Sequence, residues 1–198
     1  MVYKSLLLFG APGSGKGTQG KIIGTIPGFF HCACGDVFRA VDVRSELGKA
    51  FLEYSSTGQL VPDDITIRLW SQQIEGMERA GRFKPDIDFL VLDGIPRNVN
   101  QAKILGSKLD VRRVFHLECP DKAKVLDRLQ RRALKENRLD DINVEVIERR
   151  LRVYEEESKP VLEFYGPGLV TKVNTDQWPY QVLRDILNDI EHYRKPVD

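Results

Sequence analysis

A glycine-rich segment near the start of the chain carries the first residues that could do chemistry. Glycines stand at positions 10, 13, 15 and 17, and Lys16 lies between the last two. A glycine backbone can adopt positive φ, so the N–H groups of such a loop can approach an anion closely. The lysine adds a mobile positive charge, and the N-terminus of a following helix adds its dipole. The spacing from Gly10 to Lys16 predicts a phosphate-binding loop, although the expected hydroxyl comes one position late, at Thr18.

An aspartate further along the chain could complete this site. Asp93 follows the apolar run Phe89–Leu92 and precedes Gly94. A carboxylate at the end of a buried strand can orient water around a Mg²⁺ ion that phosphates hold. The same residue could instead cap the turn before the glycine. The phosphate-binding loop that precedes it in the chain favours the first interpretation.

Arginines that follow two other predicted strands are the next candidates. Arg39 comes shortly after Gly35–Asp36, and Arg97 follows Pro96. A guanidinium group is permanently charged and forms paired hydrogen bonds with phosphate oxygens. In an open α/β sheet, ligands bind beyond the carboxyl ends of the strands, so both arginines could face the phosphate-binding loop. Each could also be a surface ion-pair partner.

A second group of arginines surrounds a short polar segment at residues 135–141. Arg128 and Arg132 lie four positions apart, so they share one face of a predicted helix. Arg138 lies within the segment, and Arg149 and Arg150 lie on the helix behind it. An arm with arginines at both ends resembles a lid that delivers positive charge as it closes. Because acidic residues are interleaved with these arginines, a solvated helical face is the alternative.

Strands and helices alternate along the chain, which predicts how these residues are positioned. The run Leu6–Phe9 is apolar throughout, as expected for a strand buried on both faces of a parallel sheet. The pattern predicts an α/β fold, a three-layer sandwich with a mostly parallel sheet. A helix that starts near residue 64 is expected to have Asp63 or Asp64 as its N-cap. We expect strands at residues 3–9, 29–32, 89–94, 114–117 and 169–173, and the other helices near 18–26, 37–54, 102–105, 122–134, 144–158 (with a restart or kink at 160) and 182–190.

Composition narrows the class of protein. The 198 residues are 41% hydrophobic, which is ample for one buried core, and the net charge of +1 provides no global field for nucleic acid. No apolar run reaches the length of a membrane span, and no signal core precedes the first strand. The three cysteines, Cys32, Cys34 and Cys119, cannot all pair and lack the spacing of a zinc site. We therefore expect a cytoplasmic protein with no nucleic acid or membrane partner.

Five short segments fall in one order along nearly the whole chain. They are Gly10–Thr18, Gly35–Arg39, Gly58–Asp63, Asp93–Gln101 and Arg138–Asp141. Together they resemble adenylate kinases, which are members of the nucleoside monophosphate (NMP) kinase family. The resemblance implies a P-loop NTPase-type core in one domain, residues 1–198. It also implies an NMP-binding insert at residues 33–62 and a short lid at residues 131–141.

The resemblance implies a role for each matching residue. The residues implied for ATP are Gly13, Ser14, Gly15, Lys16, Gly17, Thr18, Arg128 and Arg132. Those implied for AMP are Cys34, Arg39, Gln59, Leu60, Val61, Gly94, Arg97, Gln101, Arg138, Arg149 and Arg150. Those implied for the transfer step are Lys16, Asp93, Arg97, Arg128, Arg132, Arg138 and Arg150. Mg²⁺ is expected to accompany ATP through water, with Asp93 and Thr18 nearby and no direct protein ligand.

Three departures from the family pattern bear on the site. Cys34 stands where threonine is usual, and Ile95 stands where phenylalanine is usual. The stretch after Arg138 is one residue longer than usual, which leaves two candidates for the arginine that faces the phosphates. The spacing favours Arg149, whereas the Arg150–Leu151 context favours Arg150. Adjacent residues on a helix point about 100° apart, so both cannot face the phosphates equally. We expect Arg150 to do so.

The resemblance implies an adenylate kinase that acts as a monomer and converts ATP and AMP into two ADP with Mg²⁺. Gln101 favours AMP, because a carboxamide can pair with the amino group and a ring nitrogen of adenine. The nearest alternative is a UMP/CMP kinase on the same fold. A nucleotide-binding regulatory module with little catalysis and an NTPase switch are the others. An NTPase switch needs no acceptor site, so it would not explain the second arginine-rich site.

Overall fold

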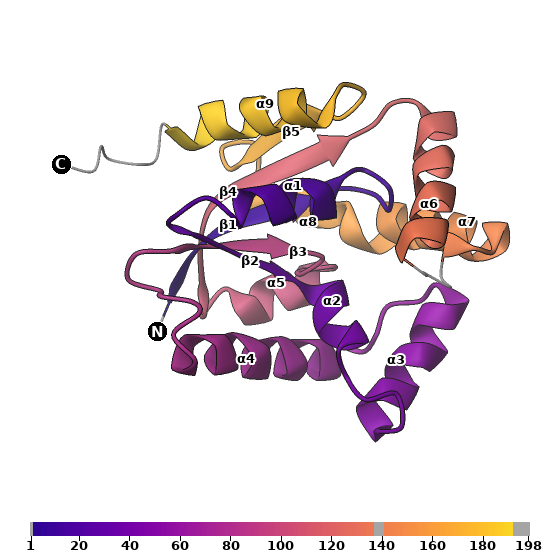
Figure 1. The fold of residues 1–198 in the computed structure, drawn as a ribbon, viewed down its shortest axis with the longest axis horizontal. Helices are drawn as coiled ribbons and strands as arrows, with labels where there is room; N and C mark the ends of the chain where they lie inside the picture. Colours follow the sequence, from indigo (N-terminus) through magenta and orange to yellow (C-terminus); the bar gives the residue numbers. More distant parts are fainter. Residues whose placement is uncertain (1, 137–140, 192–198) are drawn as a thin grey trace.

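A five-stranded parallel sheet forms the centre of the molecule, as a computed structural model that describes residues 2–136 and 141–191 shows (Figure 1). The strands lie in the order β2-β3-β1-β4-β5, and every neighbouring pair is parallel. The expected α/β class is confirmed, and the sheet is wholly parallel rather than mostly so. The strands are β1 (Tyr3–Phe9), β2 (Phe29–Ala33), β3 (Phe89–Asp93), β4 (Leu109–Glu118) and β5 (Val170–Asn174).

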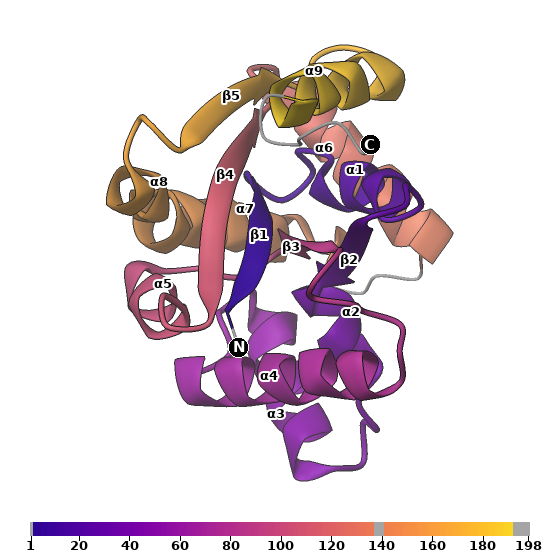
Figure 2. The ribbon, with the colours of Figure 1, turned by 90° about the vertical axis from the view of Figure 1, so that its left-hand side faces the viewer.

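Helices cover both faces of this sheet and make the expected three layers (Figures 1 and 2). Leu6 and Leu8 of β1 pack with α1 (Lys16–Ile23) and α9 (Pro179–Glu191) on one face. Leu7 and Phe9 alternate with them and pack on the other face, which α4 (Asp63–Arg79), α5 (Val99–Leu105) and α8 (Pro160–Tyr165) cover. This alternation explains why β1 is apolar throughout. Within residues 2–136 and 141–191, no helix is long and apolar enough to cross a membrane.

Strand register brings the ends of β1, β2 and β3 together at one edge of the sheet. Asp93, the last residue of β3, lies beside Leu8 of β1 and beside Ala33 of β2. The chain continues from Ala33 into Cys34, and from β1 into the glycine-rich loop. Because all the strands are parallel, their carboxyl ends meet at this edge, so residues far apart in the sequence converge there.

The segment after β2 differs from the single helix expected at residues 37–54. It forms two helices, α2 (Cys34–Arg39) and α3 (Glu46–Thr57), joined by a turn. Ser45 ends the turn, because its side chain accepts a hydrogen bond from the Gly48 N–H and caps α3. The apolar spacing alone could not reveal the break, since both helices place apolar residues toward the same core.

Two other expected boundaries were wrong. Neither Asp63 nor Asp64 caps α4, because Pro62 occupies that position and the Asp63 carboxylate binds side chains of another helix. Strand β4 begins at Leu109, five residues earlier than expected. Its first residues include Asp110, Arg112 and Arg113, but the strand pairs with β1 from Tyr3 onward, with a register shift between the partners of Ser5 and Leu6.

The last part of the chain contains a change of helix type. Helices α6 (Lys122–Glu136) and α7 (Val144–Val153) pack through a small core of their own, which includes Val125, Leu129 and Ile147. The helix expected to run to residue 158 continues after α7 as a π-helical turn, Tyr154–Ser158, before α8 restarts at Pro160. Such turns are frequent at functional sites. The last helix, α9, covers the expected residues.

A histidine packs tightly between β2 and α1. A Cβ atom on Gly20 would lie only 2.2 Å from Nε2 of His31, so glycine is required there for the ring to fit. Nε2 is buried and has no hydrogen-bond partner among the described residues. Burial lowers the pKa of His31 below its ordinary value, while Asp93 and Asp36 act in the opposite direction. The imidazole is therefore neutral in the folded protein at neutral pH.

This packing predicts a loss of stability in mild acid. Because the pKa of His31 is lower in the folded state, the unfolded chain binds the proton first, and the free energy of unfolding falls as the pH drops below about 6.5. We expect His31→Asn to lose less stability between pH 7.5 and pH 5.5 than the wild type, measured by urea unfolding. Equal losses in both proteins would show that His31 does not carry this dependence.

Candidate active site

A cavity of about 1000 Å³ opens at the carboxyl edge of the sheet. The glycine-rich loop and α1 form one side, and α2 with the segment after α3 forms another. Residues from α6, from the end of α7 and from the loop before α9 complete the wall. The volume lies at the upper end of the range for small-molecule sites. Nearly all the candidate residues within the described ranges line it.

The glycine-rich loop has the geometry of an anion cradle. Gly15 caps α1 in the left-handed conformation, at φ +96°, which favours glycine over residues with a side chain. A Cβ atom there would meet nothing within 4 Å, so the space above the helix N-terminus is open to a ligand. Ser14 is buried at the same turn, and its hydroxyl has no partner among the described residues. These features suit a phosphate group.

Lys16 lies folded against its own loop. Its Nζ donates hydrogen bonds to the carbonyl oxygens of Gly10, at 2.6 Å, and Ala11, at 3.0 Å. Burial, together with the charges of three nearby arginines, lowers the pKa of Lys16 to about 8, although the attraction of Asp93 acts in the opposite direction. The ammonium group is therefore still charged at neutral pH, and an added anion would stabilise it.

Asp93 faces the same loop from β3. Its Oδ2 lies 3.5 Å from the position that a Cβ on Gly17 would take, so the carboxylate is close to the first turn of α1. Thr18 lies on the exposed side of that turn, although it lines the cavity. No group of three potential metal ligands from His, Cys, Asp or Glu occurs in residues 2–136 and 141–191. One carboxylate fits a Mg²⁺ ion that is held mainly by phosphates and water.

Two arginines meet at a buried carboxylate between α6 and α7. Asp141 is fully buried, and Arg132 binds it through Nε, at 2.6 Å, and Nη2, at 3.0 Å. Arg150 binds the same carboxylate through Nη1. Burial alone would raise the pKa of Asp141, but the two guanidinium groups outweigh it and hold the pKa below its ordinary value. Arg132 and Arg150 both line the cavity, so the pair is oriented toward it.

Adjacent residues Arg149 and Arg150 point in different directions, as expected of neighbours on a helix. Arg150 lines the central cavity. Arg149 is exposed, lines a smaller neighbouring cavity of about 430 Å³, and lies with Nη1 3.4 Å from the carbonyl oxygen of Thr57. Of the two, only Arg150 therefore lines the central cavity, and its role toward the phosphates stays a prediction. Arg138 lies outside the described residues.

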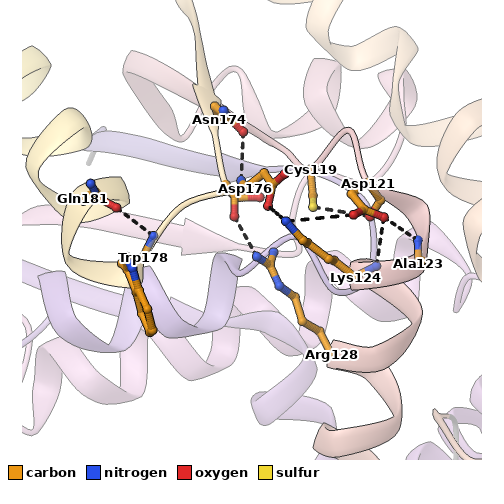
Figure 3. A network of polar contacts seen from close by, with 10 residues as sticks. Cys119, Asp121, Ala123, Lys124, Arg128, Asn174, Asp176, Trp178 and Gln181 are labelled. Carbon is orange, nitrogen blue, oxygen red and sulfur yellow. Dashed lines mark hydrogen bonds and ion pairs between the residues drawn. The ribbon is translucent and has the colours of Figure 1, made fainter.

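Arg128 belongs to a polar network between α6 and the loop before α9 (Figure 3). Its Nη2 donates to the carbonyl oxygen of Thr175, at 2.7 Å, and Lys124 pairs with Asp176. The loop also carries Trp178, which is 70% exposed, lines the cavity and donates through its backbone N–H to Gln181. Gln19 of α1 donates to the carbonyl oxygen of Pro179 and so ties the start of α9, next to this loop, to α1.

The opposite end of the cavity is lined by residues near α2 and β3. Cys34 is buried, and burial raises the pKa of its thiol to about 11, so the sulfur stays protonated. Arg39 pairs with Asp36, and Arg97 donates through Nε to the carbonyl oxygen of Gly94 at 2.9 Å. Gln59, Leu60 and Val61 line the same end.

Gln101 also lines this end, and both ends of its amide already have partners. Its Oε1 accepts a hydrogen bond from the Arg97 N–H, and its Nε2 donates to Asp63, each at 2.8 Å. It is only 1% exposed, so it is a buried residue of α5 rather than one on the solvent face of the helix.

Sequence reasoning missed three residues at or beside the site. The sequence pattern assigns no role to Asp141 or Trp178, and it gives Asp63 only the role of a helix cap. A carboxylate in an arginine-rich segment could have suggested the partner role of Asp141. The partners of Asp63 and the exposure of Trp178 depend on tertiary packing that residue spacing does not encode.

The fold and the cavity define the class of protein. A parallel sheet in this strand order, with a phosphate-binding glycine loop leading from β1 into α1, belongs to the P-loop nucleotide-binding proteins. A sequence model of the family described as adenylate kinase matches residues 8–168. The chain therefore belongs to the adenylate kinase family and is a phosphotransferase of the nucleoside monophosphate kinase class.

Individual relatives agree with this assignment. An adenylate kinase of Thermobifida fusca is 40% identical over 179 residues, which cover 85% of this chain and 88% of the relative. An adenylate kinase of Nocardia farcinica is 38% identical over 85% of this chain and 89% of its own length. One from Porphyromonas gingivalis is 35% identical over 81% of each chain.

The different directions of the two adjacent arginines predict different effects of removing them. We expect Arg150→Ala to lower kcat by about tenfold or more, because a guanidinium group beside a transferring phosphoryl group stabilises its developing charge. Arg149→Ala is expected to change kcat by less than about threefold, since Arg149 lies outside the central cavity. Because Arg150→Ala also removes a partner of the buried Asp141, the melting temperatures of both variants should be measured to separate a loss of stability from a loss of activity. A larger kcat loss in Arg149→Ala would contradict the assignment.

Proposed function

We propose that the protein catalyses reversible, Mg²⁺-dependent phosphoryl transfer from ATP to AMP, giving two ADP. The observation that carries the proposal is one cavity with a phosphate cradle on one side and a separate arginine-bearing pocket on the other. Phosphoryl transfer depends mainly on holding two substrates in line and neutralising the charge of the moving group. A cavity with two such ends suits a donor and an acceptor nucleotide together.

The donor end would hold ATP on the glycine-rich loop. The backbone from Gly13 to Thr18 would surround its outer phosphates, and Lys16 would exchange its carbonyl partners for phosphate oxygens. Arg128 would turn from Thr175 toward the phosphates. The exposed face of Trp178 lies at the same end and offers a flat surface on which a base can stack.

The transfer step would use the charge gathered around Asp141. Arg132 and Arg150 reach the cavity from this buried carboxylate, and phosphate oxygens would compete with it for their N–H groups. Such preorganised donors stabilise negative charge as it spreads over the moving phosphoryl group. Arg97 would act from the acceptor end, and the same role is proposed for Arg138.

Mg²⁺ would be held by the phosphates of ATP and by water, with Asp93 as the nearby carboxylate. When bound, the ion neutralises phosphate oxygens and helps to align them. Asp93 itself would orient coordinated water by accepting hydrogen bonds from it. Thr18 follows Gly17 in the first turn of α1, and its hydroxyl is proposed as a second polar contact near the ion.

AMP would occupy the acceptor end, with its phosphate near Arg39 and Arg97 and its base near Gln101. Gln59, Leu60, Val61 and Gly94 would supply the surrounding wall. Cys34 replaces a hydroxyl with a weak S–H donor. One neutral hydrogen bond contributes about 0.5–1.5 kcal/mol, so this change would weaken AMP binding without reversing the preference for it.

Two further proposals concern organisation. The segments at residues 33–62 and 131–141 would act as the NMP-binding insert and the lid of a single domain, closing over the substrates to exclude water. The expectations of a monomer and of a cytoplasmic location stay predictions. A UMP/CMP kinase on the same fold is the competing assignment, because both enzymes require the same phosphate chemistry.

The choice between these assignments can be measured directly. We expect the protein to convert Mg·ATP and AMP into ADP, with kcat/KM for AMP above the values for CMP and UMP. The margin over UMP should be at least about tenfold, because the amide of Gln101 can pair with the amino group and ring nitrogen of adenine but not with the keto group and N–H of uracil. Higher activity with CMP or UMP would replace the adenylate kinase assignment. Binding of nucleotides without any diphosphate product would favour a regulatory module.

Lys16 provides a second test. We expect Lys16→Met to lower kcat by about 10² or more, since the variant keeps the apolar stem but loses the charge beside the donor phosphates. Lys4→Met, on β1 and exposed, is the matched control and should retain activity. Circular dichroism should be unchanged in both variants. Near-normal turnover of a folded Lys16→Met enzyme would reject the phosphate-binding role.

A further inference from the structure

We propose that Asp63 is a positioning residue that locks the side-chain amide of Gln101 in one orientation. The locked amide would select acceptor nucleotides whose base carries an amino group over those whose base carries a keto group at the same position. This inference rests on the proposed function, because it concerns the acceptor end of the same cavity. It adds a residue outside the cavity to the determinants of base selectivity.

The hydrogen bonds of Gln101 allow only one orientation of its amide. Asp63 Oδ1 can only accept from Nε2, and the backbone N–H of Arg97 can only donate to Oε1, both at 2.8 Å. A rotation of the amide by 180° would set two donors against each other at one end and two acceptors at the other. Burial of Gln101 makes these mismatches costly.

The carboxylate of Asp63 accepts hydrogen bonds from three side-chain amides. It accepts from Asn98 at 2.9 Å and from Asn100 at 2.7 Å, in addition to Gln101. Although burial alone would raise the pKa of Asp63, these three donors outweigh it and lower the pKa, so the group stays an ionised acceptor at neutral pH. Asn98 also caps α5 by accepting from the Gln101 N–H, which fixes the backbone behind the amide.

Asp63 does not line the central cavity. It lines the smaller neighbouring cavity with Asn98, whereas Gln101 lines the central one. We therefore expect no direct contact between Asp63 and a nucleotide in the central cavity. The carboxylate would influence the base only through the orientation of the amide.

The locked amide presents a defined pattern to a base. Nε2 keeps one N–H after binding Asp63, and Oε1 keeps one lone pair after binding Arg97. Adenine offers an amino donor beside a ring-nitrogen acceptor, so it can satisfy both. Hypoxanthine has the same ring shape but offers a carbonyl acceptor beside an N–H donor. If its sugar and phosphate hold it in the same place, its carbonyl oxygen would face Oε1 of Gln101, and its N–H would face the N–H of Nε2.

AMP and IMP are therefore the matched substrates for the test. We expect the wild-type ratio of kcat/KM for AMP to that for IMP to be about tenfold or more, because two buried polar contacts are mismatched with IMP. In Asp63→Ala the ratio should fall by about three- to tenfold, since one of the two anchors of the amide is lost. The kcat for AMP should stay within about threefold of the wild type.

Two control variants separate this effect from general damage. Asp64→Ala removes an exposed carboxylate from the same helical turn. Asn100→Ala removes a side chain that donates to Oδ2 of Asp63, whereas Gln101 donates to Oδ1. Both should keep the wild-type AMP-to-IMP ratio. A purely structural role of Asp63 would lower kcat/KM for both nucleotides equally and leave the ratio unchanged, which would overturn the proposal.

The remaining outcomes are also decisive. If Asp63→Ala does not fold, Asp63→Leu keeps a similar side-chain volume without an acceptor for Gln101 Nε2, and it should lower the ratio in the same direction. Gln101→Met should bring the ratio close to one, and an unchanged ratio in that variant would overturn the proposal. A wild-type enzyme that uses AMP and IMP equally would refute the lock while leaving the proposed function intact. Failure to phosphorylate AMP at all would instead refute the proposed function.

Discussion

Positive charge concentrated at one edge of the sheet is the constraint on which the rest of the site depends. Lys16, Arg97, Arg132 and Arg150 lie close enough for the last three to lower the pKa of the lysine. Such a group can be stable without a ligand only if each charge has a local acceptor. The loop carbonyls serve Lys16, and the buried carboxylate of Asp141 serves Arg132 and Arg150. These acceptors hold the donors where an incoming phosphate would need them.

The parallel sheet makes this concentration possible. Its strand register sets Asp93 between Leu8 and Ala33, so one carboxylate stands beside the start of both the glycine-rich loop and α2. The two faces of β1 pack into different buried clusters, so a shift of the strand by one residue would force both clusters to repack. The geometry of the cavity edge is therefore held by the core rather than by the loops that line it.

Much of this architecture could be predicted from the sequence, because it depends on local patterns. The buried run Leu6–Phe9 and the glycines after it specify a strand, a loop and a helix through short-range physics. The break between α2 and α3 could not be found in the same way, since both helices face one core. The bonds of Asp63 to Asn98 and Asn100 join residues 35 and 37 positions apart, and only the packing of α4 against α5 creates them.

The two ends of the cavity differ in how their contacts can discriminate between ligands. At the proposed donor end, an exposed tryptophan offers a stacking surface that any base can use, since every base has a π-face. At the proposed acceptor end, Gln101 is buried and has a fixed partner at each polar atom of its amide. A buried polar group rejects a mismatched ligand more strongly than an apolar surface does, because the mismatch leaves donors and acceptors unpaired. Base selectivity should therefore reside at the acceptor end, where α4 and α5 hold the amide from behind.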